Sequence, residues 1–215
     1  MINQEVVQLI SWIPIGLIFI GGFSGIWRYA SLGRIQKLLT WLLVIAFLTE
    51  IAPYFVEILS ENTYPTFHVY AVLEYCLLAL IFSNANAKTR LAPFLKISIP
   101  VMAIYALMNV LFWQPLTTPN TNVIIVSCII MITLSVGFFF IALNRMAYQR
   151  IERSAMFWIS IGVLIYFSSI FVMFTFLDWL ISLHFENASS LFTLNTLLNI
   201  IHYLCFNIAL WMKPE

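Results

Sequence analysis

Seven long apolar segments, separated by short polar stretches, constrain this chain more than any other feature of its sequence. Each is long enough to cross the hydrocarbon core of a bilayer, which takes about 20 helical residues. The chain has 215 residues, of which 62% are hydrophobic and only 9% are charged, whereas a soluble domain is typically about 25% charged. We therefore expect an all-α membrane protein, with residues 1–215 forming a single domain that is a seven transmembrane helix bundle. The expected helices are 7–27, 38–59, 66–83, 93–113, 122–144, 155–181 and 190–212.

The basic residues lie on one side of this predicted topology. All ten lie in or beside the segments that follow the first, third, fifth and seventh helices, and the segments on the other side carry none. Because cytoplasmic loops are enriched in Lys and Arg, this distribution predicts an N-terminus outside the cell and a C-terminus in the cytoplasm. The basic residues are Arg28, Arg34, Lys37, Lys88, Arg90, Lys96, Arg145, Arg150, Arg153 and Lys213.

The apolar segments also indicate where in the cell the protein resides. We expect a multi-pass protein of a cell membrane, with the lipid bilayer as its main partner. The N-terminal "MINQE" lacks the basic region of a signal peptide, so the first helix is expected to be retained. The basic loops are short and lack the interleaved aromatic residues of a nucleic-acid surface, so we expect no nucleic-acid partner.

Polar residues interrupt the apolar segments at helical spacing, beginning with Glu74 in the third segment, "YAVLEYCLLALIF". A charged group at the bilayer centre costs about 2.5–3.5 kcal/mol, so such residues usually face a bundle interior or a wet cavity. Spacings of three and four residues place the polar residues of five helices on one face each. These faces comprise Glu50, Tyr54, Glu57 and Glu61; Tyr70 and Glu74; Tyr105 and Asn109; Ser168, Thr175, Asp178 and Ser182; and Asn195, Asn199 and His202.

These polar faces predict a cavity that opens toward the outside. At 1.5 Å per residue, Glu74 is expected about 12 Å, and His202 about 18 Å, below the outer boundary. Glu74 and His202 either form a structural hydrogen bond that joins the third and seventh helices or titrate together as a protonation switch. The sequence leaves both interpretations open. The candidate ligand-binding or proton-switch residues are Glu50, Tyr54, Glu74, Tyr70, Asp178, Asn195, Asn199 and His202.

The sequence supplies no pattern typical of an enzyme or a metal site. Imidazole and carboxylate groups are common metal ligands, but the three histidines, His68, His184 and His202, are widely spaced. Two of them, His68 and His184, lie at predicted helix ends and are expected to be surface residues. We expect no catalytic residues, no metal and no cofactor. A lipid hydrolase is a weak third hypothesis, because no Ser–His–Asp or metal set can be placed.

Several seven-helix families lack support in these residues. The only lysines, Lys37, Lys88, Lys96 and Lys213, are predicted to be cytoplasmic, so none can hold retinal in the last helix. The third helix ends in "FSNANAK" and the seventh lacks Asn-Pro-x-x-Tyr, which argues against G-protein-coupled receptors. Zinc-dependent seven-helix hydrolases need paired histidines in the last helix, where His202 stands alone. PQ-loop sugar transporters need Pro-Gln, whereas this chain has the reversed Gln114-Pro115.

Four motifs lie in the third helix, after the fourth helix, in the sixth helix and in the seventh helix: "HVYAVLEY", "LFWQPLTTPNTN", "FWISIGVLIYFSSIFVMF" and "NIIHYLCFNIALW". In these motifs the chain resembles a poorly characterised family of small bacterial (Bacteroidetes-type) seven-helix integral membrane proteins. The resemblance implies a sensor or receptor-like module that works with a signalling partner such as a histidine kinase, and it implies no ligand or reaction. Its pattern positions here are Glu74, Phe157, Trp158, Tyr166, His202 and Trp211.

Two functions from different classes remain. The leading hypothesis, which the resemblance places in a bacterial inner (cytoplasmic) membrane, is a non-enzymatic sensory or receptor-like protein. It would bind a small ligand or a proton and act through a separate cytoplasmic or membrane partner. The alternative is a small-solute, possibly proton-coupled, transporter with Glu50, Glu74, Asp178 and His202 at its site. A weak similarity between the second and third helices and the sixth and seventh is compatible with the transporter. The oligomeric state is open, although Gly16, Gly21, Gly22 and Gly25 offer small residues for close helix contact.

Overall fold

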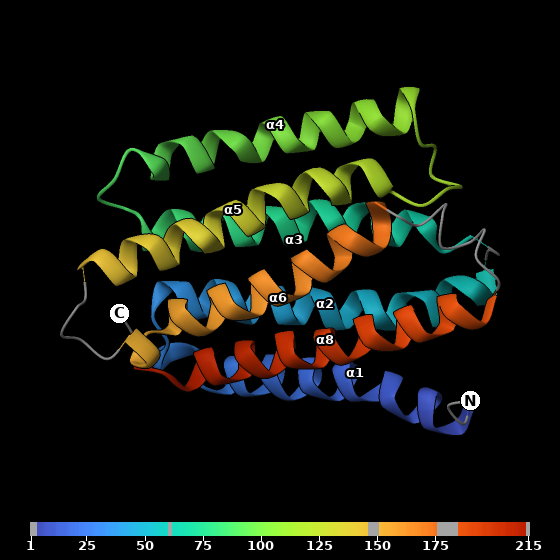
Figure 1. The fold of residues 1–215 in the computed structure, drawn as a ribbon, viewed down its shortest axis with the longest axis horizontal. Coiled ribbons are helices and arrows are strands. Elements are labelled where there is room, and N and C mark those ends of the chain that lie inside the picture. Colours follow the sequence, from blue (N-terminus) through green and yellow to red (C-terminus); the bar gives the residue numbers. More distant parts are fainter. Residues whose placement is uncertain (1–3, 60–61, 146–150, 176–184, 214–215) are drawn as a thin grey trace. The chain divides into compact units, whose positions relative to one another are not determined.

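The computed structural model describes residues 4–59, 62–145, 151–175 and 185–213. Within these ranges, seven helices are long and apolar enough to cross a membrane (Figure 1). The expected seven-helix architecture is therefore confirmed, and the chain is a multi-pass membrane protein. The helices are α1 Gln4–Trp27, α2 Arg34–Leu59, α3 Tyr64–Ala85, α4 Leu91–Phe112, α5 Thr121–Arg145, α6 Ala155–Thr175 and α8 Phe185–Trp211.

Most helices extend beyond the apolar stretches that predict them. The second helix was expected from residue 38 but begins at Arg34, and the last begins at Phe185 rather than at residue 190. Hydropathy locates only the part of a helix that crosses hydrocarbon, whereas backbone hydrogen bonding continues into flanking polar residues. The predicted end of the sixth helix, 176–181, lies outside the described residues.

The chain divides into two compact units. We call residues 22–127 the α2–α4 unit, and residues 1–21 with 128–213 the α6–α8 unit. The boundaries fall inside two helices, so the end of α1 belongs to the α2–α4 unit and most of α5 belongs to the α6–α8 unit. Each unit is described separately.

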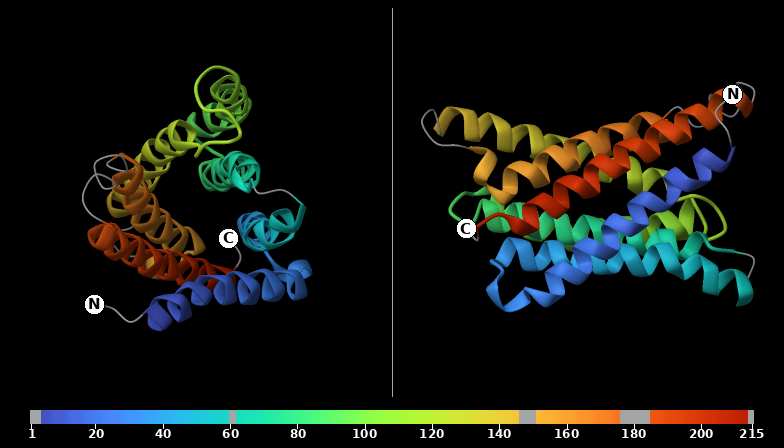
Figure 2. Two further views of the ribbon diagram at one scale, coloured as in Figure 1. Left: turned by 90° about the vertical axis from the view of Figure 1, so that its right-hand side faces the viewer. Right: turned by 90° about the horizontal axis from the view of Figure 1, so that it is seen from below.

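In the α2–α4 unit, α3 packs against α2 on one side and α4 on the other, and neighbouring helices run in opposite directions (Figure 2). Leu43 of α2 and Leu78 and Phe82 of α3 are fully buried. At the end of α1, a Cβ on Gly25 would overlap the side chain of Thr40. Only glycine permits this close approach of α1 to α2, which is a common use of small residues between membrane helices.

The outward face of α4 is apolar. Phe94, Ile97, Val101, Ile104 and Leu111 are all more than half exposed. A soluble monomer rarely exposes so continuous an apolar surface. In a bilayer this face requires no partner, because lipid tails are as apolar as the side chains themselves.

In the α6–α8 unit, α6 and α8 run antiparallel and form the principal contact (Figure 1). A Cβ on Gly162 of α6 would lie 3.1 Å from both the Cβ of Cys205 and the backbone oxygen of His202 on α8. The two backbones therefore approach closely at this point. Asn207 of α8 reaches α1, where its side-chain nitrogen donates to the backbone oxygen of Leu17 over 3.0 Å.

Candidate functional site

His202 is enclosed by aromatic rings in the α6–α8 unit. Its side chain is only 1% exposed. The imidazole stacks on the ring of Tyr166 with 4.5 Å between centroids and an interplanar angle of 28°. The centroids of the Tyr203 and Phe206 rings lie 5.0 and 4.0 Å from the centroid of the imidazole. The ring also lies against Gly162, where Nδ1 is 3.4 Å from the position that a Cβ would occupy.

This enclosure leaves polar atoms without well-aligned hydrogen-bond partners. Among the described residues, neither Nδ1 of His202 nor Oδ1 of Asn199 has such a partner, and both atoms are buried. The two residues are three apart on α8, so their side chains emerge from neighbouring positions on one helix face. The predicted stripe on this helix therefore includes two buried atoms able to bind a polar group.

Asn195, the third residue of the polar face predicted on this helix, contacts α6. Oδ1 of Asn195 accepts a hydrogen bond of 2.9 Å from the hydroxyl of Ser169. The sequence had placed Ser168 on the polar face of the sixth helix, and the observed partner is the next residue along. The spacing of Asn195, Asn199 and His202 predicted a shared face. Asn195 contacts α6 through Ser169, and His202 contacts it through Gly162 and Tyr166, as that prediction requires of these two residues.

A second polar pair lies on α3 of the α2–α4 unit. The hydroxyl of Tyr70 donates to Oε1 of Glu74 over 3.0 Å, one helical turn apart. Glu74 and Glu50 of α2 are both half-buried. Tyr54 lies in α2, but its side chain is outside the description, and Asp178 is outside the described residues altogether. Within this unit, the structure therefore brings together Tyr70 and Glu74.

The two groups of predicted residues belong to different units. Glu74 lies in the α2–α4 unit and His202 in the α6–α8 unit. Their direct pairing, whether as a structural hydrogen bond or as a protonation switch, stays a prediction. The local surroundings differ: Glu74 has a hydroxyl donor one turn away, whereas His202 is packed among rings.

One expectation about the histidines was wrong. His68 was expected at the surface because it lies near a helix end, but it is only 5% exposed. Its Nε2 lies 2.9 Å from the backbone oxygen of Thr118, in the connection between α4 and α5. That connection covers the beginning of α3 and buries the ring. In the described part of the chain, no three His, Cys, Asp or Glu side chains gather as a metal site would require.

The sequence also missed a cluster of side-chain amides beside His68. Nδ2 of Asn109 donates to Oε1 of Gln114 and to Oδ1 of Asn120, each over 3.1 Å. Nδ2 of Asn122 donates to Oδ1 of Asn109 over 2.9 Å. Four amide residues within "NVLFWQPLTTPNTN" at a helix connection are a signal that could have identified this amide cluster.

Comparison with known proteins supplies no family. No family model matches the chain, and neither a curated protein nor a solved structure is significantly similar to it. The resemblance to bacterial seven-helix proteins therefore stays an expectation. Some of its pattern positions have local structural roles: Nε1 of Trp158 donates to the backbone oxygen of Glu152, and Tyr166 stacks on His202.

Proposed function

We propose that this chain is a membrane-embedded sensory or receptor-like protein that binds a small ligand or a proton and acts through a separate partner. In this proposal it resides in a bacterial inner membrane with its N-terminus outside. The support for that orientation is the confinement of the basic residues to alternate inter-helix segments and the C-terminal end. The role is binding rather than catalysis.

The observation that carries the proposal is a pair of buried polar atoms on α8, Oδ1 of Asn199 and Nδ1 of His202, neither of which has a well-aligned hydrogen-bond partner among the described residues. Leaving a buried polar atom without a partner costs about 1–3 kcal/mol, and folded proteins rarely tolerate it without a reason. A small ligand that hydrogen-bonds to both atoms would offset this cost. The aromatic rings around His202 would supply apolar contact for the rest of the ligand.

The signal would leave through another chain. The described connections between helices are short, such as residues 28–33 between α1 and α2 and 86–90 between α3 and α4. A helix shift in the bundle would therefore be read by a partner that docks on the basic loops. A histidine kinase is the kind of partner that the sequence resemblance implies.

A transporter remains the second candidate because the chain divides into two compact units. Alternating access in many transporters moves one bundle against another around a site near the midplane. The membrane-embedded carboxylate of Glu74 would then carry the coupled proton.

A proteoliposome assay distinguishes these two functions. The protein is reconstituted in vesicles that contain a pH-sensitive dye, and small polar solutes are added outside. We expect no solute-driven acidification above that of empty vesicles, with wild type and Glu74→Gln behaving alike. Acidification that occurs in wild type and in the exposed-site control Glu152→Gln, but is abolished by Glu74→Gln, would establish the transporter and refute the sensor.

A further inference from the structure

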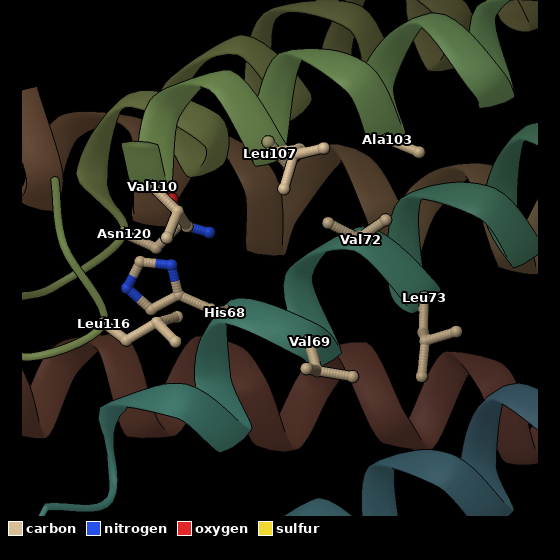
Figure 3. Close-up of a pocket in the computed structure, with 10 residues that line it drawn as sticks. His68, Val69, Val72, Leu73, Ala103, Leu107, Val110, Leu116 and Asn120 are labelled. Carbon is tan, nitrogen blue, oxygen red and sulfur yellow. The ribbon is translucent and has the colours of Figure 1, made fainter. Parts of the chain in front are cut away.

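The α2–α4 unit contains a pocket that the proposed function does not use. Its volume is about 380 Å³, and it lies between α3 and α4 beside the connection to α5 (Figure 3). Its walls are aliphatic, including Val72, Leu107 and Val110. His68 and Asn120 lie together at one end (Figure 3). The pocket therefore has a long apolar part and one polar end.

The hydrogen bond of His68 determines what its ring offers to the pocket. Nε2 lies 2.9 Å from the backbone oxygen of Thr118. A carbonyl oxygen can only accept, so Nε2 must carry the proton and donate. In a neutral ring the other nitrogen, Nδ1, is then an acceptor. Nδ1 is buried and has no partner in the part of the chain that the structure describes.

A chain of hydrogen bonds likewise determines the orientation of Asn120. The backbone N–H of Asn122 donates to Oε1 of Gln114, so the Asn109 group facing that oxygen must be its NH₂. The same NH₂ donates to Asn120, which must therefore present its oxygen to Asn109. The NH₂ of Asn120 is left on the other side, toward the pocket (Figure 3). It is buried, and it too lacks a partner among the described residues.

We propose that this pocket binds an aliphatic alcohol, such as a single-chain lipid with a free hydroxyl group. A hydroxyl is the simplest group that donates to Nδ1 of His68 and also accepts from Nδ2 of Asn120. An aliphatic chain suits the remaining walls. Three of the lining residues, Val69, Leu73 and Leu107, are exposed, so the pocket is open and the ligand can enter it from the surrounding hydrocarbon. This site is independent of the one proposed beside His202.

The test compares three probes that differ only at one end: 1-dodecanol, dodecyl methyl ether and dodecane. Each is titrated over the same range of mole fractions into the protein in lipid nanodiscs, and the rise in the thermal midpoint of unfolding is measured. The ether can accept from Asn120 but cannot donate to His68, and the alkane can do neither. We expect the alcohol to raise the thermal midpoint at a concentration about tenfold lower than the ether requires. The alkane should require a higher concentration than the ether.

Two variants on α4 locate the effect without disturbing the buried polar groups. Ala103 lines the pocket, whereas its neighbour Ile104 is exposed and lies outside the lining. Ala103→Phe, which fills the apolar part, should raise the required dodecanol concentration at least about tenfold, and Ile104→Phe should leave it unchanged. The proposal fails if the three probes act at equal concentrations, if Ala103→Phe responds like wild type, or if a density map with dodecanol shows only water between His68 and Asn120.

Discussion

Replacing Asn109 by Leu is expected to destabilise the protein by about 2–4 kcal/mol. Asn109 is fully buried and joins Gln114, Asn120 and Asn122 through three hydrogen bonds. Leucine has the same branched arrangement of side-chain heavy atoms but larger end groups, so the loss would combine the partner groups left unpaired with some overpacking. These partners tie the α4–α5 connection to the end of α4, and the connection in turn buries His68.

The measurement is the free energy of unfolding of purified protein in mixed micelles titrated with a denaturing detergent. Thr117→Ala is the matched control, because Thr117 lies in the same connection and is exposed. We expect this control to change the free energy of unfolding by less than about 0.5 kcal/mol. Equal stability of Asn109→Leu and wild type would show that the amide cluster does not hold the connection in place.

Substitution of Gly162 by Ala should destabilise the α6–α8 contact by about 1–3 kcal/mol. The added Cβ would lie 3.1 Å from the Cβ of Cys205 and from the backbone oxygen of His202. Neither atom is the flexible end of a side chain, so α6 and α8 would have to separate slightly. The same unfolding titration measures the loss.

The glycine in α5 provides the control for this prediction. A Cβ on Gly137 would meet no atom within 4 Å in the described structure, so Gly137→Ala should be neutral or slightly stabilising. In a Cys205→Gly background, Gly162→Ala should cost less than it does in wild type, because one of the two close contacts is already relieved. If Gly162→Ala and Gly137→Ala are equally stable, the close approach of α6 and α8 is not required.

The sequence was a good guide to the helices and to the spacing of polar residues along each. Seven apolar stretches predicted seven helices because the bilayer permits few other structures. Asn195 and His202 both contact α6, because a regular helix preserves the spacing of residues three and four apart and so keeps them on one face. Each of these correct predictions concerns the residues of a single helix.

What the sequence could not predict depends on groups that lie far apart in the chain or on loop conformation. His68 is buried because the backbone of Thr118, fifty residues away in sequence, folds over it. Gly162 could have served any purpose that glycine serves, and only the position of α8 shows that it permits close packing. Asn109 was recognised as polar, but its partners lie beyond the end of its helix, where helical periodicity carries no information.

Ligand-induced thermal stabilisation measures whether a small polar ligand binds beside His202 and Asn199. A set of small water-soluble solutes is screened against wild type and His202→Phe in the same nanodiscs. Phenylalanine keeps a ring against Tyr166 but removes both ring nitrogens. We expect at least one solute to raise the thermal midpoint of wild type with a saturable dependence on concentration and to leave that of His202→Phe unchanged. A ligand site at His202 and Asn199 is ruled out if no solute stabilises wild type, or if every stabilising solute acts equally on both proteins.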